Sequence, residues 1–218
     1  MNRPKHQGVA EAVERKRRSE MILQARAIPI NPRLAPLRSS LEVVLRSADE
    51  VARRCATLCV IASCAEPGGM SVPMVRRILK ARDLDDTLSP QEQRFLKSKN
   101  PTDEQRARFT WRYESAWVLL WALGRVKGLG DPADVCDATR AVRLTLAEDF
   151  LLDPSLRPPS AILDEADLHW RMHWAVADAL LNDRPAPPGL DPDVVYERHH
   201  AFNWLMGQAG PAWDEADE

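Results

Sequence analysis

The segment over residues 111–126 constrains the fold more than any other part of this 218-residue chain. It reads WRYESAWVLLWALGRV. On a helical wheel, at about 100° per residue, Trp117 and Trp121 occupy one side and Leu120 occupies another. The remaining sides of the helix are also largely apolar. A helix that is apolar on every face is buried on every face. We therefore predict that this segment is the tryptophan-rich central helix of a bundle.

Helix starts are well marked along the rest of the chain, whereas strand patterns are almost absent. Three positions carry the capping-box pattern, in which a Ser or Thr is followed three residues later by Glu or Gln: Ser47, Ser89 and Thr102. Three more positions predict capped starts: Asp131 and Asp191, each before a proline, and Ser160. The predicted helices are then 10–26, 48–65, 72–82, 90–98, 103–126, 132–149, 161–182 and 192–206. The sequence predicts an all-α, single-domain bundle of seven to eight helices around the central one.

The length of the chain fits one domain. We expect a flexible or partly helical arm over residues 1–14, a single all-helical domain over 15–214 and an acidic tail over 215–218. The first twenty residues lack the apolar stretch of a secretory signal, and the longest strongly apolar stretch is shorter than the roughly 20 residues that span a bilayer. These features predict a cytoplasmic protein that does not associate with membranes.

Charge is distributed unevenly along the chain. Residues 1–38 carry nine Lys/Arg and three Asp/Glu, whereas residues 129–218 carry six and eighteen. The two parts could attract each other within one fold or steer two different partners. We favour the internal pairing, because a compact chain of this size brings its halves together. The basic run Arg15–Arg18 has no interleaved aromatic residue, so we interpret it as a solvated helix face and predict no nucleic-acid binding.

Several charged residues lie on helix faces that are otherwise apolar. Together with one tryptophan they form a candidate buried polar cluster or pocket: Arg112, Glu114, Arg171, Asp178, Glu197, Arg198 and Trp204. Unpaired charges are very costly in a core, so each charged member should have a partner. The favoured interpretation is one or two ion networks that fix the register of the helices. The alternatives are a pocket that binds a ligand or partner through its arginines and catalysis by one of the glutamates.

Metal and cysteine chemistry have little support in the sequence. His169 and His173 have the i,i+4 spacing of two metal ligands on a helix, but no H-E-x-x-H motif is present and His200 and Asn203 are expected to face solvent. The four cysteines form no C-x-x-C motif, so we interpret them as small core side chains in a reducing compartment. No nucleophile elbow, Walker loop or dinucleotide fingerprint occurs. We predict no metal, no cofactor and no catalytic residue.

Three motifs, taken in order, resemble the bacterial family called domain of unknown function 4272. They are WRYESAWVLLWALG from Trp111, DLHWRMHWAVAD from Asp167 and ERHHAFNWL from Glu197, followed by the pair Trp213-Asp214. The segment LRSADE from Leu45 fits the same pattern. The resemblance covers about residues 15–214 and implies a bacterial, cytoplasmic protein. It implies no activity, and it marks these family-type positions: Arg112, Glu114, Arg171, Glu197, Arg198, Asn203, Trp204 and Trp213.

These observations favour a non-enzymatic helical protein that binds a protein partner, of the immunity or accessory type. The alternative is an enzyme or ligand-binding protein that uses a buried Glu/Arg/His cluster on a small anionic ligand. An open, ligand-sized cavity that reaches Arg112 and Arg198 would favour the alternative, whereas a filled core with an exposed apolar or acidic patch would favour the binding protein. The sequence does not specify the oligomeric state.

Overall fold

The computed structural model describes residues 3–207 and 212–215, and within these ranges every regular element is a helix. The all-α prediction is therefore confirmed. The helices are α1 (Arg3–Ala25), α2 (Ala48–Ala65), α3 (Val72–Ala81), η1 (Asp85–Thr87), α4 (Pro90–Lys97), α5 (Asp103–Thr110), α6 (Arg112–Ala122), α7 (Ala138–Thr145), α8 (Pro159–Leu181), α9 (Pro192–Leu205) and η2 (Trp213–Glu215). Helix α1 begins earlier than expected. Most of the predicted acidic tail, residues 216–218, lies outside the described residues.

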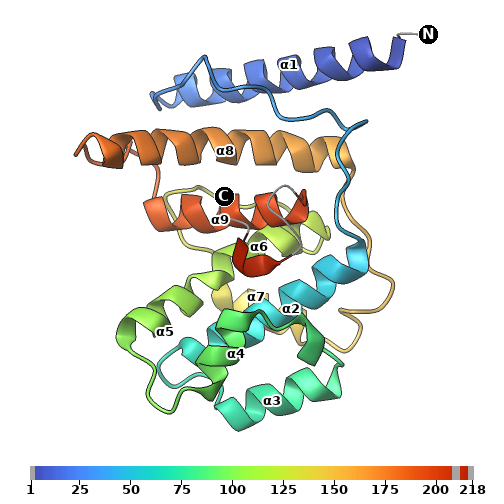
Figure 1. Ribbon diagram of the computed structural model, residues 1–218, viewed down its shortest axis with the longest axis vertical. Helices are drawn as coiled ribbons and strands as arrows, with labels where there is room; N and C mark the ends of the chain where they lie inside the picture. The colour runs from blue at the N-terminus through green and yellow to red at the C-terminus, as the bar shows by residue number, and fades with distance from the viewer. Residues whose placement is uncertain (1–2, 208–211, 216–218) are drawn as a thin grey trace.

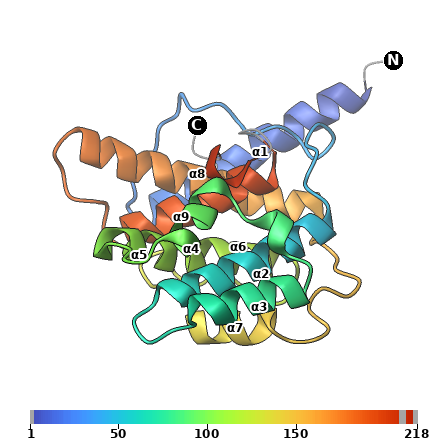
Figure 2. The same ribbon diagram turned by 60° about the horizontal axis from the view of Figure 1, so that its bottom comes forward.

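The long helices are stacked one on another (Figure 1). Helix α1 packs on α8, α8 on α9, and α9 on α6, while α2 lies between α6 and α3. Helices α4 and α5 lie beside the α2–α3 end of the stack, and the second view places α7 at the opposite end of the molecule from α1 (Figure 2). None of the described helices is both long and apolar enough to cross a membrane.

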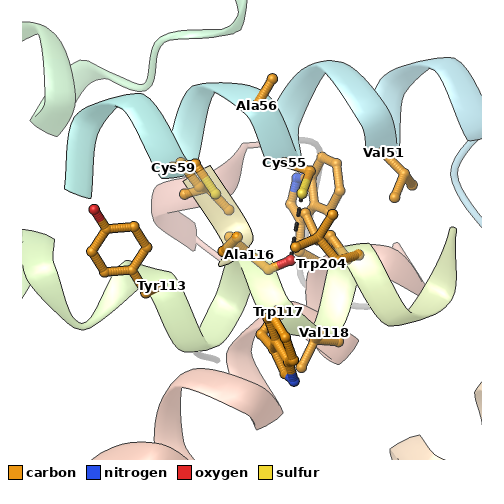
Figure 3. Close-up of a cluster of buried hydrophobic side chains, with 14 of the residues drawn as sticks. Val51, Cys55, Ala56, Cys59, Tyr113, Ala116, Trp117, Val118 and Trp204 are labelled. Carbon is orange, nitrogen blue, oxygen red and sulfur yellow. Dashed lines mark hydrogen bonds between the residues drawn. The ribbon is translucent and has the colours of Figure 1, made fainter. Parts of the chain in front are cut away.

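Helix α6 is the centre of the bundle, as the sequence predicts, but it is shorter than expected. All of its residues are buried. Figure 3 shows its side chains packed against α2, where the Cys55 thiol donates a hydrogen bond to the Ala116 carbonyl. The helix ends early because Gly124 adopts a φ of +70° and the Arg125 N–H bonds back to the Leu120 carbonyl at 2.9 Å.

The predicted helix over 103–126 is also divided near its middle. The Glu114 N–H bonds to the Trp111 carbonyl at 3.0 Å, three residues back rather than four. This tightened turn separates α5 from α6.

Capping chemistry accounts for most of the helix starts. The boxes at Ser47, Ser89 and Thr102 are all present, and Asp191 caps α9. Hydrogen bonds of this kind satisfy backbone N–H groups that have no partner within the helix.

Two predicted starts are wrong. Asp131 accepts a hydrogen bond from the Ala133 N–H, but the chain then forms an isolated turn, and the helix begins later, where Asp137 caps α7. An Asp side chain bonds to the backbone in a turn just as well as at a helix end. Ser160 lies inside α8, because Pro159 already occupies the first helical position.

Ion pairs join the basic N-terminal part of the chain to the acidic C-terminal part. Arg15 and Arg18 of α1 both bond to Asp164 of α8, at 3.1 and 2.8 Å. Arg26 bonds to Asp131 at 3.1 Å. Part of the acidic charge is thus neutralised within the fold, as the internal interpretation expects.

Candidate functional site

Two ion pairs connect α6 to α9 inside the core. Arg112 lies 3.2 Å from the Glu197 carboxylate, which also accepts a hydrogen bond from the Ser115 hydroxyl at 2.5 Å. Arg198 donates from Nε to Glu114 at 3.0 Å, and the backbone N–H of Cys136 donates to the same glutamate. These four charged residues all belong to the predicted polar cluster, and in the fold they form two neighbouring Arg–Glu pairs.

The α6–α9 pairs are closed to solvent. The four residues that form them are each only 1–4% exposed: Arg112, Glu114, Glu197 and Arg198. The Arg198 guanidinium is further held by the carbonyls of Gly130 and Asp134, at 3.4 and 3.3 Å. Buried charges that are paired and hydrogen-bonded in this way hold two helices in one register.

Two other members of the predicted cluster lie apart from it. Arg171 bonds to Asp167 on its own helix at 2.8 Å and faces Glu20 of α1 at 3.6 Å, so it belongs to the α1–α8 contact. Asp178 pairs with Arg184 at the far end of α8.

The histidines of α8 and α9 stack among aromatic rings. Burial lowers the pKa of His169 to about 4, and its Nδ1 lies 2.9 Å from the Glu165 carbonyl. Because a carbonyl can only accept, Nδ1 carries the proton of the neutral ring. The His173 and His199 rings stack at 4.4 Å. His200 is buried against Trp213 rather than facing solvent as expected. The described residues include no group of three potential metal ligands.

An open cleft of about 500 Å³ lies beside the buried pairs, where α2, η1, the first turn of α4, the end of α9 and η2 meet. We call it the Arg–Trp cleft. Its lining residues are Arg46, Asp49, Glu50, Arg53, Arg54, Asp86, Thr87, Leu88, Ser89, Pro90, Trp204, Ala212 and Trp213. Of the residues predicted as a site, Trp204 lies here.

Two arginines cover the two tryptophans of this cleft. The Arg46 guanidinium lies 4.3 Å from the Trp204 ring centre, and the Arg54 guanidinium lies 4.4 Å from that of Trp213. Arg54 also forms a buried, bidentate ion pair with Glu92, in which one of the two N–O distances is 2.9 Å. Cation–π contacts and forked carboxylate bonds both fix a guanidinium in one orientation. The two indole rings lie beneath these guanidinium groups and are themselves buried, with Trp204 6% and Trp213 4% exposed.

The Arg–Trp cleft also contains polar groups whose bonding is incomplete. The indole N–H of Trp213 and the Nε–H of Arg54 are buried without a hydrogen-bond acceptor among the described residues. A buried donor without an acceptor costs free energy, and such groups are uncommon in folded proteins. Burial also lowers the pKa of Arg46.

Arg46, Arg53 and Arg54 are not among the site residues predicted from the sequence. Two features of the sequence pointed to this region. Arg46 lies in the LRSADE segment and Trp213 lies in the Trp-Asp pair, and both segments contribute to the family resemblance. The arginines of α2 come together with Trp213 only through the tertiary fold.

A smaller cavity of about 220 Å³ lies between α5, α6 and the start of α7, and its lining includes Tyr113, Glu114 and Cys136. Burial and the neighbouring Glu114 raise the pKa of the Cys136 thiol well above its usual range. Burial raises the pKa of the Tyr113 phenol in the same way. The nucleophilic form of cysteine is the thiolate, so this thiol is not activated at neutral pH.

Comparison with known families places the chain in one of them. The model of the family "Domain of unknown function (DUF4272)" matches residues 15–216. The match covers most of the chain, so the chain belongs to this family and the resemblance in the motifs is confirmed. No curated protein and no solved structure matches the chain.

Proposed function

We propose that this member of the family is a non-enzymatic binding protein that acts on a protein partner, of the immunity or accessory type. The observation that carries the proposal is the Arg–Trp cleft, in which Arg46 and Arg54 lie over two tryptophan rings. Tryptophan and arginine are the residue types that contribute most to protein–protein binding energy, particularly where they form a central pocket. The cleft is large enough to receive one or two side chains of a partner.

The charges of the cleft favour a protein segment over a small anion. Three arginines line it, and so do three acidic residues, Asp49, Glu50 and Asp86. Because these charges balance, the lining has no net attraction for a free anion. A partner segment that carries both donors and acceptors complements such a lining.

The alternative function, action on a small anionic ligand by a buried Glu/Arg/His cluster, has less support. Arg112 and Arg198 are each already paired with a glutamate and nearly inaccessible. A ligand would have to displace a buried carboxylate from its partner, which leaves an uncompensated charge in the core.

Photo-crosslinking in the native cell tests the proposal. A photoreactive amino acid replaces Asp49, which is exposed on the cleft lining, and in a second strain it replaces Arg143, which is exposed on α7 outside the cleft. We expect a discrete protein adduct from position 49 and none from position 143.

A variant of the cleft adds a second comparison. In the strain with the photoreactive residue at position 49, Arg53→Gln should weaken the adduct and Arg143→Gln should leave it unchanged. Equal adducts from positions 49 and 143, or no adduct from either, would contradict the proposal.

A further inference from the structure

A second groove, of about 320 Å³, lies between α4 and α5. We call it the α4–α5 groove. Both walls present the same residue types at the same spacing, Gln-x-x-Arg-Phe: Gln91, Arg94 and Phe95 from α4, and Gln105, Arg108 and Phe109 from α5. Positions i, i+3 and i+4 share one face of a helix. The groove is therefore lined by matched pairs of amide, guanidinium and phenyl groups.

The floor of the α4–α5 groove is rigid and its rim carries exposed cations. The Phe95 and Phe109 rings pack together at 4.4 Å and are buried. Arg94 and Arg108 are exposed, and neither forms an ion pair with a carboxylate among the described residues. Within the part of the chain that the structure describes, the Arg94 side chain bonds only to the carbonyl of Pro90, at 3.3 Å.

The surroundings of the α4–α5 groove are basic as well. Residues 93–109 carry five Lys/Arg and only two Asp/Glu. The lining differs in this respect from that of the Arg–Trp cleft, where acidic side chains balance the arginines. Two guanidinium groups flanked by two carboxamides are suited to binding carboxylates, because a carboxylate accepts two parallel N–H hydrogen bonds from one guanidinium.

The first turn of α4 joins the two hollows. Pro90 lines the Arg–Trp cleft and Gln91, the next residue, lines the α4–α5 groove. The Gln91 N–H donates to the Asp214 carboxylate at 3.0 Å, which fixes this turn against the η2 segment that carries Trp213. A single extended segment could therefore cross from one hollow to the other.

We infer that the α4–α5 groove binds an acidic segment of a protein partner, through carboxylates that pair with Arg94 and Arg108. The inference rests on the proposed function, since the segment would belong to the partner bound at the Arg–Trp cleft. It adds the chemical class of that partner segment: an extended chain rich in Asp or Glu.

Fluorescence anisotropy of labelled octaglutamate in 0.15 M NaCl tests the inference with the full chain. At this ionic strength distant charges are largely screened, so binding reports close pairing. We expect saturable binding that weakens by at least about tenfold in Arg94→Gln/Arg108→Gln, because two charge-assisted hydrogen bonds to the peptide carboxylates are lost. The matched control is Arg77→Gln/Arg143→Gln, which removes the same charge from exposed positions outside the groove. It should bind within about twofold of the parent.

Four results would overturn the inference. The first is no saturable binding of octaglutamate, and the second is an equal loss in the control variant. The third is tight binding of a phosphoserine peptide without binding of octaglutamate, which would make phosphate the ligand. The fourth is a self-associated form in sedimentation that Arg94→Gln/Arg108→Gln dissolves, which would make a second copy of the chain the occupant. Adducts from position 49 in any of these cases would leave the proposed function standing, so the two can fail separately.

Discussion

Replacing Arg198 by methionine isolates the role of the buried α6–α9 pairs. Methionine keeps an unbranched apolar stem of similar length but removes the guanidinium. Glu114 then stays in the core with an exposed fraction of 2% and without the Nε–H donor that lies 3.0 Å from it. Of the donors among the described residues, the backbone N–H of Cys136 is then the one that still donates to the carboxylate.

The expected loss is large relative to the stability of a typical domain. Removing one partner of a buried ion pair costs about 3–5 kcal/mol, because the remaining charge is desolvated and uncompensated. Whole domains are stable by only about 5–15 kcal/mol. Urea unfolding followed by tryptophan fluorescence measures the loss as a lower midpoint at unchanged slope.

Two further variants separate the pair from its surroundings. Glu114→Leu combined with Arg198→Met removes both charges, and we expect it to recover most of the lost free energy, because apolar replacement of a buried pair is often neutral or stabilising. Arg143→Met, at an exposed position of α7, should change the free energy of unfolding by less than about 0.5 kcal/mol. If Arg198→Met were as stable as the parent, the structural interpretation of the pairs would be refuted and a site at Arg198 would gain support.

Three more predictions concern single residues. The pKa of His169 is about 4 in the folded state and about 6.5 in the unfolded state. As the pH falls, the unfolded state is therefore protonated before the folded state. The free energy of unfolding should fall by about 3 kcal/mol between pH 6.5 and 4, and His169→Phe should reduce that fall in a pH series of urea titrations. Asp137→Ala removes the cap of α7 and should cost about 1 kcal/mol, measured in the same way. Cys136 should react with a thiol reagent much more slowly than a free thiol at pH 7, because its pKa is raised; rapid labelling at this position would contradict the buried environment.

The sequence was sufficient for those parts of the fold that depend on local chemistry. The capping boxes at Ser47, Ser89 and Thr102 use a hydrogen bond within four residues, so pattern and structure agree. The burial of α6 also follows from its sequence, since no face of it is polar.

The errors arose where tertiary contacts select between local alternatives. The Asp131-Pro132 pair could start a helix or make a turn. In the fold, Asp131 bonds to Arg26, which follows the end of α1, and the Pro132 carbonyl accepts a hydrogen bond from the Asp191 N–H at 2.9 Å. The division at Trp111 has no proline or glycine to mark it. By contrast, Gly124 did mark the end of α6, and the prediction extended past it.

The candidate site was predicted only in part for a related reason. A helical wheel identifies charges that lie on an apolar face, and so it found Arg112, Glu114, Glu197 and Arg198. The wheel does not specify which of these residues pair with one another. It also grouped Arg171 with them, although in the fold Arg171 faces a carboxylate of α1. The Arg–Trp cleft depends on residues from five elements, and their meeting is a property of the tertiary structure.

The α6–α9 pairs maintain the fold, whereas we propose that the two hollows beside α4 bind the partner. Photo-crosslinking from position 49 in the Glu114→Leu/Arg198→Met background separates these two roles. We expect this variant to fold and to give the same partner adduct as the parent. A variant that folds with the parent's melting temperature yet gives no adduct would contradict the claim, because the buried charges would then be part of the binding site.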